Sequence, residues 1–97
     1  MSGDVGSRRV VVDQQALVRP LPDEEAVVLH LQTEIYFGLN ATGLRMWNAL
    51  TTATSVNSAI ESMLNEFHVD ESHLRTDVEA FIDDLTDRGL VRLEDSA

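Results

Sequence analysis

The chain has 97 residues, so we expect one domain with a modest hydrophobic core. It contains no cysteine, which excludes disulfides and thiolate metal sites and fits a reducing cytoplasm. The formal net charge is −10 and lysine is absent, so the chain is poorly suited to bind the phosphate backbone of a nucleic acid.

The negative charge is concentrated in the second half of the sequence. Residues 1–50 hold four Arg and six acidic residues, whereas residues 51–97 hold three Arg and eleven acidic residues. Such residues commonly just solvate a helix face, but their excess would also attract a basic partner. No apolar run approaches the roughly 20 residues of a membrane span, and the N-terminus lacks the apolar core of a signal peptide.

The N-terminal segment predicts a tail and a first strand. Residues 1–7 carry Ser and Gly without an apolar period, which is typical of a disordered tail. The β-branched segment that begins at Arg8 suits a strand, and Pro20 and Pro22 predict a loop after it.

Two further strands are predicted to form a hairpin. Side chains alternate along residues 26–32 and again along residues 35–40, as they do in strands. Residues 33–34 suit a tight turn between them. Gly38, inside the second of these strands, often marks a bulge or the close approach of another backbone.

Three helices are predicted in the second half, each with a capping residue at its start. Asn40, Ser55 and Asp70 precede the three helical periods, and each side chain can accept a hydrogen bond from the first turn. The first helix extends to about Leu50, and Gly89 suits the left-handed position after the last helix. The residues after Gly89 suit a short terminal strand or arm. The order indicates an α+β fold, winged helix-turn-helix-like, with a three-stranded antiparallel sheet followed by three helices.

No pattern of catalytic or metal-binding residues stands out. His30, His68 and His73 are the histidines of the chain, and the last two straddle a helix start, so they share no helix face. No nucleophile motif and no glycine-rich phosphate loop is present. We therefore expect a protein that is not an enzyme and that has no metal and no cofactor.

Two other functions of small proteins fit the sequence poorly. An acyl carrier protein needs a Ser at the start of a helix, usually after an Asp. Here the pair Asp95-Ser96 lies at the very C-terminus. A DNA-binding winged helix needs a basic recognition helix, but residues 71–88 hold two Arg against six acidic residues. We expect neither nucleic acid nor a membrane as a partner.

The apolar strand at residues 35–39 is the main indication of function. An unpaired strand edge is a liability unless it is short, charged or used. One interpretation is that this strand packs wholly inside the fold. The other is β-augmentation, in which an extended peptide adds to the edge as one more strand.

Two stretches of the sequence resemble the PqqD-like family. Residues 27–50, VVLHLQTEIYFGLNATGLRMWNAL, are similar to its strand–turn–strand pattern that ends in Leu-Asn before a helix with Gly and Trp. Residues 68–91, HVDESHLRTDVEAFIDDLTDRGLV, are similar to its later part. The resemblance covers about residues 9–92. Such domains are RiPP recognition elements, which bind the leader of a ribosomally made precursor peptide and present it to a modifying enzyme.

The resemblance also implies where the leader binds. In this family the leader joins the third strand and lies in a cleft between that strand and the third helix. The implied peptide-binding residues are Glu34, Ile35, Tyr36, Phe37, Gly38, Leu74, Asp77, Val78, Phe81 and Leu85. Periodicity alone does not decide which of Leu74, Val78 and Phe81 face the cleft and which face the core.

The length favours a discrete leader-binding domain, over residues 8–93, that is not fused to an enzyme. The chain looks like the leader-binding protein of lasso peptide clusters, which works in the cytoplasm with a separate leader peptidase. One alternative is a PqqD-type partner of a radical S-adenosylmethionine enzyme, and another is a winged-helix protein-interaction module. The expected partners are the precursor leader peptide and the leader peptidase or another modifying enzyme.

Overall fold

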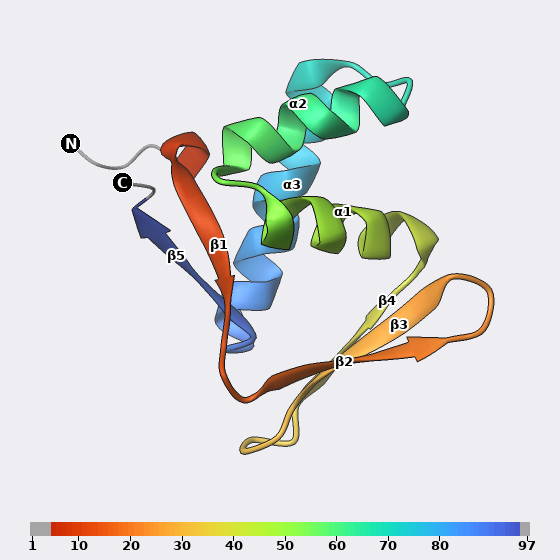
Figure 1. Ribbon diagram of the computed structural model, residues 1–97, viewed down its shortest axis with the longest axis vertical. Helices are drawn as coiled ribbons and strands as arrows, with labels where there is room; N and C mark the ends of the chain where they lie inside the picture. Colours follow the sequence, from red (N-terminus) through yellow and green to blue (C-terminus); the bar gives the residue numbers. More distant parts are fainter. Residues whose placement is uncertain (1–4, 96–97) are drawn as a thin grey trace.

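The computed structural model describes residues 5–95, which form two antiparallel sheets and three α-helices (Figure 1). In chain order the elements are η1 (Val5–Ser7), β1 (Arg8–Val12), β2 (Ala16–Leu21), β3 (Glu25–His30), β4 (Tyr36–Leu39), α1 (Ala41–Thr52), α2 (Val56–Glu66), α3 (Glu71–Asp87) and β5 (Val91–Asp95). The predicted α+β fold, with a three-stranded antiparallel sheet followed by three helices, is confirmed.

The three-stranded sheet has the order β2-β3-β4, so β3 lies in its centre. Side chains alternate between its faces, and Ala26, Val28 and Leu39 are buried on the face that α1 covers. The predicted hairpin of β3 and β4 is confirmed, but its connection is longer than two residues. Residues 31–35 connect the strands, and Glu34 among them has a left-handed φ of 64°.

The predicted first strand is wrong in one respect, because the segment forms two strands that belong to different sheets. The chain turns after β1, where the Ala16 N–H donates to the Asp13 carbonyl at 3.0 Å. Pro20 lies inside β2 rather than in a loop. A proline is tolerated there because β2 is an edge strand and needs no donor on its outer side.

The second sheet joins the two ends of the described chain. β1 pairs with β5 from Arg8 opposite Asp95 to Val12 opposite Val91, which confirms the predicted terminal strand. Residues 1–4 of the predicted disordered tail lie outside the described residues. Val5–Ser7, in contrast to that prediction, form a 3-10 helix in which Gly6 is buried against α2.

All three predicted helix caps are confirmed. The side-chain oxygens of Asn40, Ser55 and Asp70 each accept a hydrogen bond from the backbone N–H three residues further on. At the end of α3, Gly89 has a φ of 72°, and its N–H and that of Leu90 donate to carbonyls of the last turn. This is a Schellman motif, and it directs the chain into β5.

The hydrophobic core lies between the three helices and the inner faces of both sheets. Its fully buried large side chains are Leu50, Ile60, Met63, Ile82, Leu85, Leu90, Val28, Val56 and Val78. Because α2 and α3 contribute several of these residues each, the helices form one unit with the sheets. No helix within residues 5–95 combines the length and apolar character that crossing a membrane requires.

Candidate functional site

β4 is one of the two edge strands of the three-stranded sheet, so one side of its backbone faces away from β3. Within residues 5–95, β4 pairs with β3 on one side and with no strand on the other. The strand is short, with four residues, yet it carries Tyr36 and Phe37 and no charge. It therefore lacks the charged residues that usually protect a strand edge from pairing.

Hydrogen bonds to β3 determine which backbone groups of β4 face outward. The His30 N–H donates to the Ile35 carbonyl at 2.8 Å, so residue 35 directs that carbonyl toward β3. Direction alternates along an antiparallel strand, so Phe37 also directs its N–H and C=O toward β3. Tyr36 and Gly38 consequently present their N–H and C=O groups to the free edge.

A buried histidine holds the turn that leads into β4. His30 is 6% exposed, and its Nδ1 accepts a hydrogen bond from the Thr33 N–H at 3.2 Å. The ring proton is therefore on Nε2, which lies 3.7 Å from a carboxylate oxygen of Asp13. The Thr33 hydroxyl in turn accepts from the Ile35 N–H at 3.4 Å. These contacts fix the position at which the free edge begins.

Aromatic side chains connect β4 to α3. The rings of Phe37 and Phe81 lie 6.2 Å apart between their centroids, with an angle of 55° between the planes. The guanidinium carbon of Arg88 lies 4.8 Å from the Phe37 centroid, and Arg88 also pairs with Asp84 at 3.5 Å. The surface beside the free edge is thus apolar in its middle and carries an ion pair at one end.

Asp77 lies on the same face of α3 as this aromatic pair. At about 100° of rotation per residue, Asp77, Asp84 and Arg88 all fall within about 60° of Phe81 around the helix axis. Asp77 is exposed and forms no ion pair within the described residues. Asp84 and Arg88 were not among the predicted peptide-binding residues. Their spacing of three and seven residues from Phe81 would have indicated that they share its face of the helix.

Three of the implied contact residues on α3 lie in the core instead. Leu74 is 2% exposed, and Val78 and Leu85 are fully buried, so a bound peptide would not reach them in this conformation. Their side chains point toward α2 and the sheets because they continue the apolar stripe of the helix. Of the implied α3 residues, Phe81 and Asp77 remain at the surface.

The outer face of the three-stranded sheet carries exposed apolar side chains beside the charged residues Arg19 and Glu25. Apart from Val69, all the exposed large apolar side chains of the described residues lie on this sheet or in its β3–β4 turn. They are Leu17, Leu21, Leu31, Ile35 and Tyr36. Exposed apolar side chains grouped on one part of a protein commonly mark a contact with another protein.

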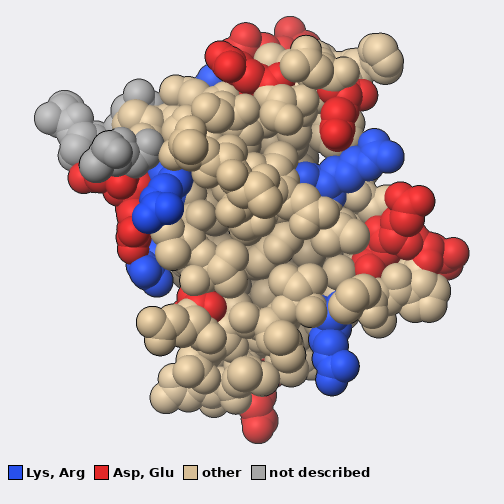
Figure 2. Space-filling model, in the orientation of Figure 1, with Lys and Arg blue, Asp and Glu red and all other residues tan. Residues whose placement is uncertain are grey.

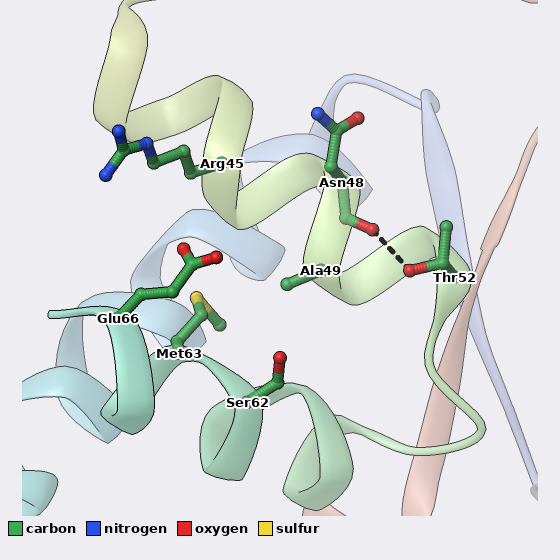
Figure 3. A pocket seen from close by; sticks show the side chains of 7 residues that line it. All are labelled: Arg45, Asn48, Ala49, Thr52, Ser62, Met63 and Glu66. Atoms are coloured by element: carbon green, nitrogen blue, oxygen red, sulfur yellow. Dashed lines mark hydrogen bonds between the residues drawn. The ribbon is translucent and has the colours of Figure 1, made fainter.

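A separate groove of about 590 Å³ lies between α1 and α2 (Figure 3). It is lined by Arg45, Asn48, Ala49, Thr52, Ser62, Met63 and Glu66. The Thr52 hydroxyl donates to the Asn48 carbonyl at 2.7 Å and so is used within α1. No lining residue belongs to β4 or α3. Within residues 5–95, no group of three or more acidic or His side chains is placed to hold a metal ion.

Comparisons with known proteins find one family and one solved structure that resemble this chain. The family model described as Coenzyme PQQ synthesis protein D (PqqD) matches residues 25–91, from the start of β3 to the start of β5. A solved structure, described as "TbiB1 in Complex with the TbiA(beta) Leader Peptide", superposes with a TM-score of 0.75 and 28% sequence identity. The match covers 84% of this chain and 94% of that chain. No curated protein matches this chain.

Proposed function

The chain belongs to the PqqD family, and from this premise we propose that it is a non-catalytic adaptor for the leader of a ribosomally synthesised precursor peptide. The leader adds as a strand to the free edge of β4 and lies in the cleft between β4 and α3. The similar structure of TbiB1, which contains a leader peptide, supports this proposal.

The free edge of β4 beside Phe81 is the observation that carries the proposal. Tyr36 and Gly38 offer unpaired backbone donors and acceptors, which an extended peptide of almost any sequence can satisfy. The Phe37–Phe81 pair offers apolar surface for the anchoring side chains of that peptide. We expect a dissociation constant between micromolar and nanomolar, or roughly −8 to −12 kcal/mol.

The second partner in this proposal is a processing enzyme, namely the leader peptidase of a lasso peptide system. The apolar outer face of the sheet supports a protein contact beyond the leader itself. Precursor peptides are made by ribosomes, so the proposed place of action is the cytoplasm. The neighbouring genes separate this proposal from a radical S-adenosylmethionine system: a transglutaminase-like peptidase and an asparagine-synthetase-like cyclase accompany the first, and a radical enzyme accompanies the second.

A binding titration with three proteins tests the adaptor function. The probe is a fluorescently labelled synthetic leader of the precursor encoded beside this chain's gene, followed by fluorescence anisotropy. The unmodified protein should bind it saturably, and Phe81→Asp should weaken binding at least about tenfold by placing a charge in the apolar cleft. Ala80→Asp is the matched control, because it adds the same charge to an exposed position of α3 about 100° away.

Circular dichroism of all three proteins must show an unchanged fold for this comparison to hold. Equal affinity of the unmodified protein and Phe81→Asp would reject the cleft as the binding site. An absence of binding by the unmodified protein at tens of micromolar would contradict the adaptor function itself.

A further inference from the structure

Gly38 leaves a gap in the outer face of β4. A Cβ atom added at this position would meet no atom of a non-neighbouring residue within 4 Å. Gly38 does not have a positive φ either, because among the described glycines Gly89 alone has one. Glycine inside a strand costs stability because it has no side chain to pack and loses more backbone entropy than other residues. Nothing within the described fold therefore accounts for a glycine at residue 38.

A shallow hollow of about 210 Å³ opens beside this gap. It is lined by Leu21, Glu25, Ala26, Val27, Gly38, Leu39 and Asn40. Val27 lies directly opposite Gly38 on β3, and Leu21 is 45% exposed at the end of β2. A side chain that reached across Gly38 would contact these two apolar residues.

The backbone of Gly38 also faces the free edge, as its alternation with Phe37 shows. A peptide strand that adds to this edge places one of its residues directly opposite Gly38. The side chain of that residue stands on the same face of the sheet as the missing Gly38 side chain, with Cβ positions about 5 Å apart. A large side chain at this position reaches the hollow, whereas a small one leaves it open.

We propose that the leader residue opposite Gly38 carries a bulky apolar side chain, preferably aromatic, which covers Gly38 and fills the hollow. Gly38 is then a specificity-determining residue for the leader. Cross-strand aromatic side chains are known to compensate for a glycine in a sheet in this way. The inference rests on the proposed function, since it requires the leader to add to β4.

A double-mutant cycle tests the inference. Each residue of the labelled leader is replaced singly by Gly, and every peptide is titrated against the unmodified protein and against Gly38→Leu. At one leader position, replacement should weaken binding to the unmodified protein about tenfold. At that same position the loss should shrink to about twofold or less with Gly38→Leu, because the added side chain already fills the hollow.

Leu17→Ala is the matched control, because it alters the same outer face on β2, two strands away from the edge. It should leave the leader profile unchanged. Open space around residue 38 predicts that Gly38→Leu folds, and Gly38→Ala, which adds a single methyl group, repeats the test with the smallest change. A leader profile that is identical for the unmodified protein and both Gly38 variants would overturn the inference while leaving the adaptor function intact. Failure of the unmodified protein to bind any leader would instead overturn the proposed function.

Discussion

Tyr36 separates the backbone role of a strand-edge residue from its side-chain role. Its side chain is 70% exposed on the outer face, so it contributes little to the stability of the free protein. Its N–H, in contrast, faces the free edge and is available to a bound peptide. A substitution that removes the N–H therefore tests strand addition with little effect on the core.

We expect Tyr36→Pro to weaken leader binding by about three- to tenfold, which is the net value of one backbone hydrogen bond. Edge positions whose N–H faces away from the sheet tolerate proline. The measurement is the same anisotropy titration, with Tyr36→Val as a control that loses the ring but keeps the N–H. Unchanged affinity of Tyr36→Pro, with an intact circular dichroism spectrum, would exclude a hydrogen bond to the leader at this residue.

At the residue scale the sequence predicted the edge strand β4 well and the exposed residues of α3 less well. Tyr36, Phe37 and Gly38 are at the predicted edge because strand alternation is a local property. On α3, a helical period shows that Val78 and Phe81 share one broad face, but not where the core ends along that face. The burial of Val78 and the partial exposure of Phe81 depend on how α3 packs against α2 and the sheets.

At the scale of elements, local chemistry predicted the helices more closely than the strands. Caps depend on residues within one turn, so all three helix starts were predicted from Asn40, Ser55 and Asp70. The division of the first predicted strand into β1 and β2 has a non-local cause, because β1 pairs with β5 at the other end of the chain. Alternation of side chains identifies a strand but not its partner.

The cap of α3 should make stability depend on pH. The Ser72 hydroxyl, which donates to the Asp70 carboxylate at 2.6 Å, and then the His73 N–H hold the pKa of Asp70 below its ordinary value of 3.8. Because the pKa is lowered in the folded state, ionised Asp70 stabilises the fold at pH values above its ordinary pKa. The contribution is lost as pH falls through the lowered pKa.

Asp70→Ala should therefore be less stable than the unmodified protein near pH 7, and the difference should shrink as the pH falls below about 4. Urea unfolding midpoints over this range measure the difference, and the titration of other carboxylates cancels between the two proteins. Ser55→Ala removes the neutral cap of α2 and should give a difference that does not depend on pH. A difference for Asp70→Ala that stays constant down to about pH 3 would show that the charge of the cap has no role.

At the scale of the whole molecule, the acidic residues surround surfaces that carry little charge. In the view of Figure 2 the acidic side chains gather along the margins, and the middle of this face is largely uncharged. On α3, Asp77 lies toward Phe81 and the proposed leader site, whereas Glu79 lies about 160° from Phe81, on the far side of the helix. In the proposed complex, the negative charge of the chain would therefore act on a leader partly through the nearby carboxylate of Asp77, which has no ion pair within residues 5–95, and partly through more distant acidic residues.

We expect the chain to favour a leader with a basic residue near Asp77, and this preference should depend on salt. Raising the salt from about 0.01 M to about 0.15 M shortens the Debye length from about 30 Å to about 8 Å, which should weaken binding of such a leader several-fold. Asp77→Asn should reduce this dependence on salt more than Glu79→Gln does, although each substitution removes one charge. Anisotropy titrations of the three proteins at both salt concentrations measure the effect. Affinities that do not change with salt would leave apolar contacts and backbone hydrogen bonds as the whole basis of recognition. An equal dependence of affinity on salt for Asp77→Asn and Glu79→Gln would assign the effect to the net charge of the chain rather than to a charge at the proposed leader site.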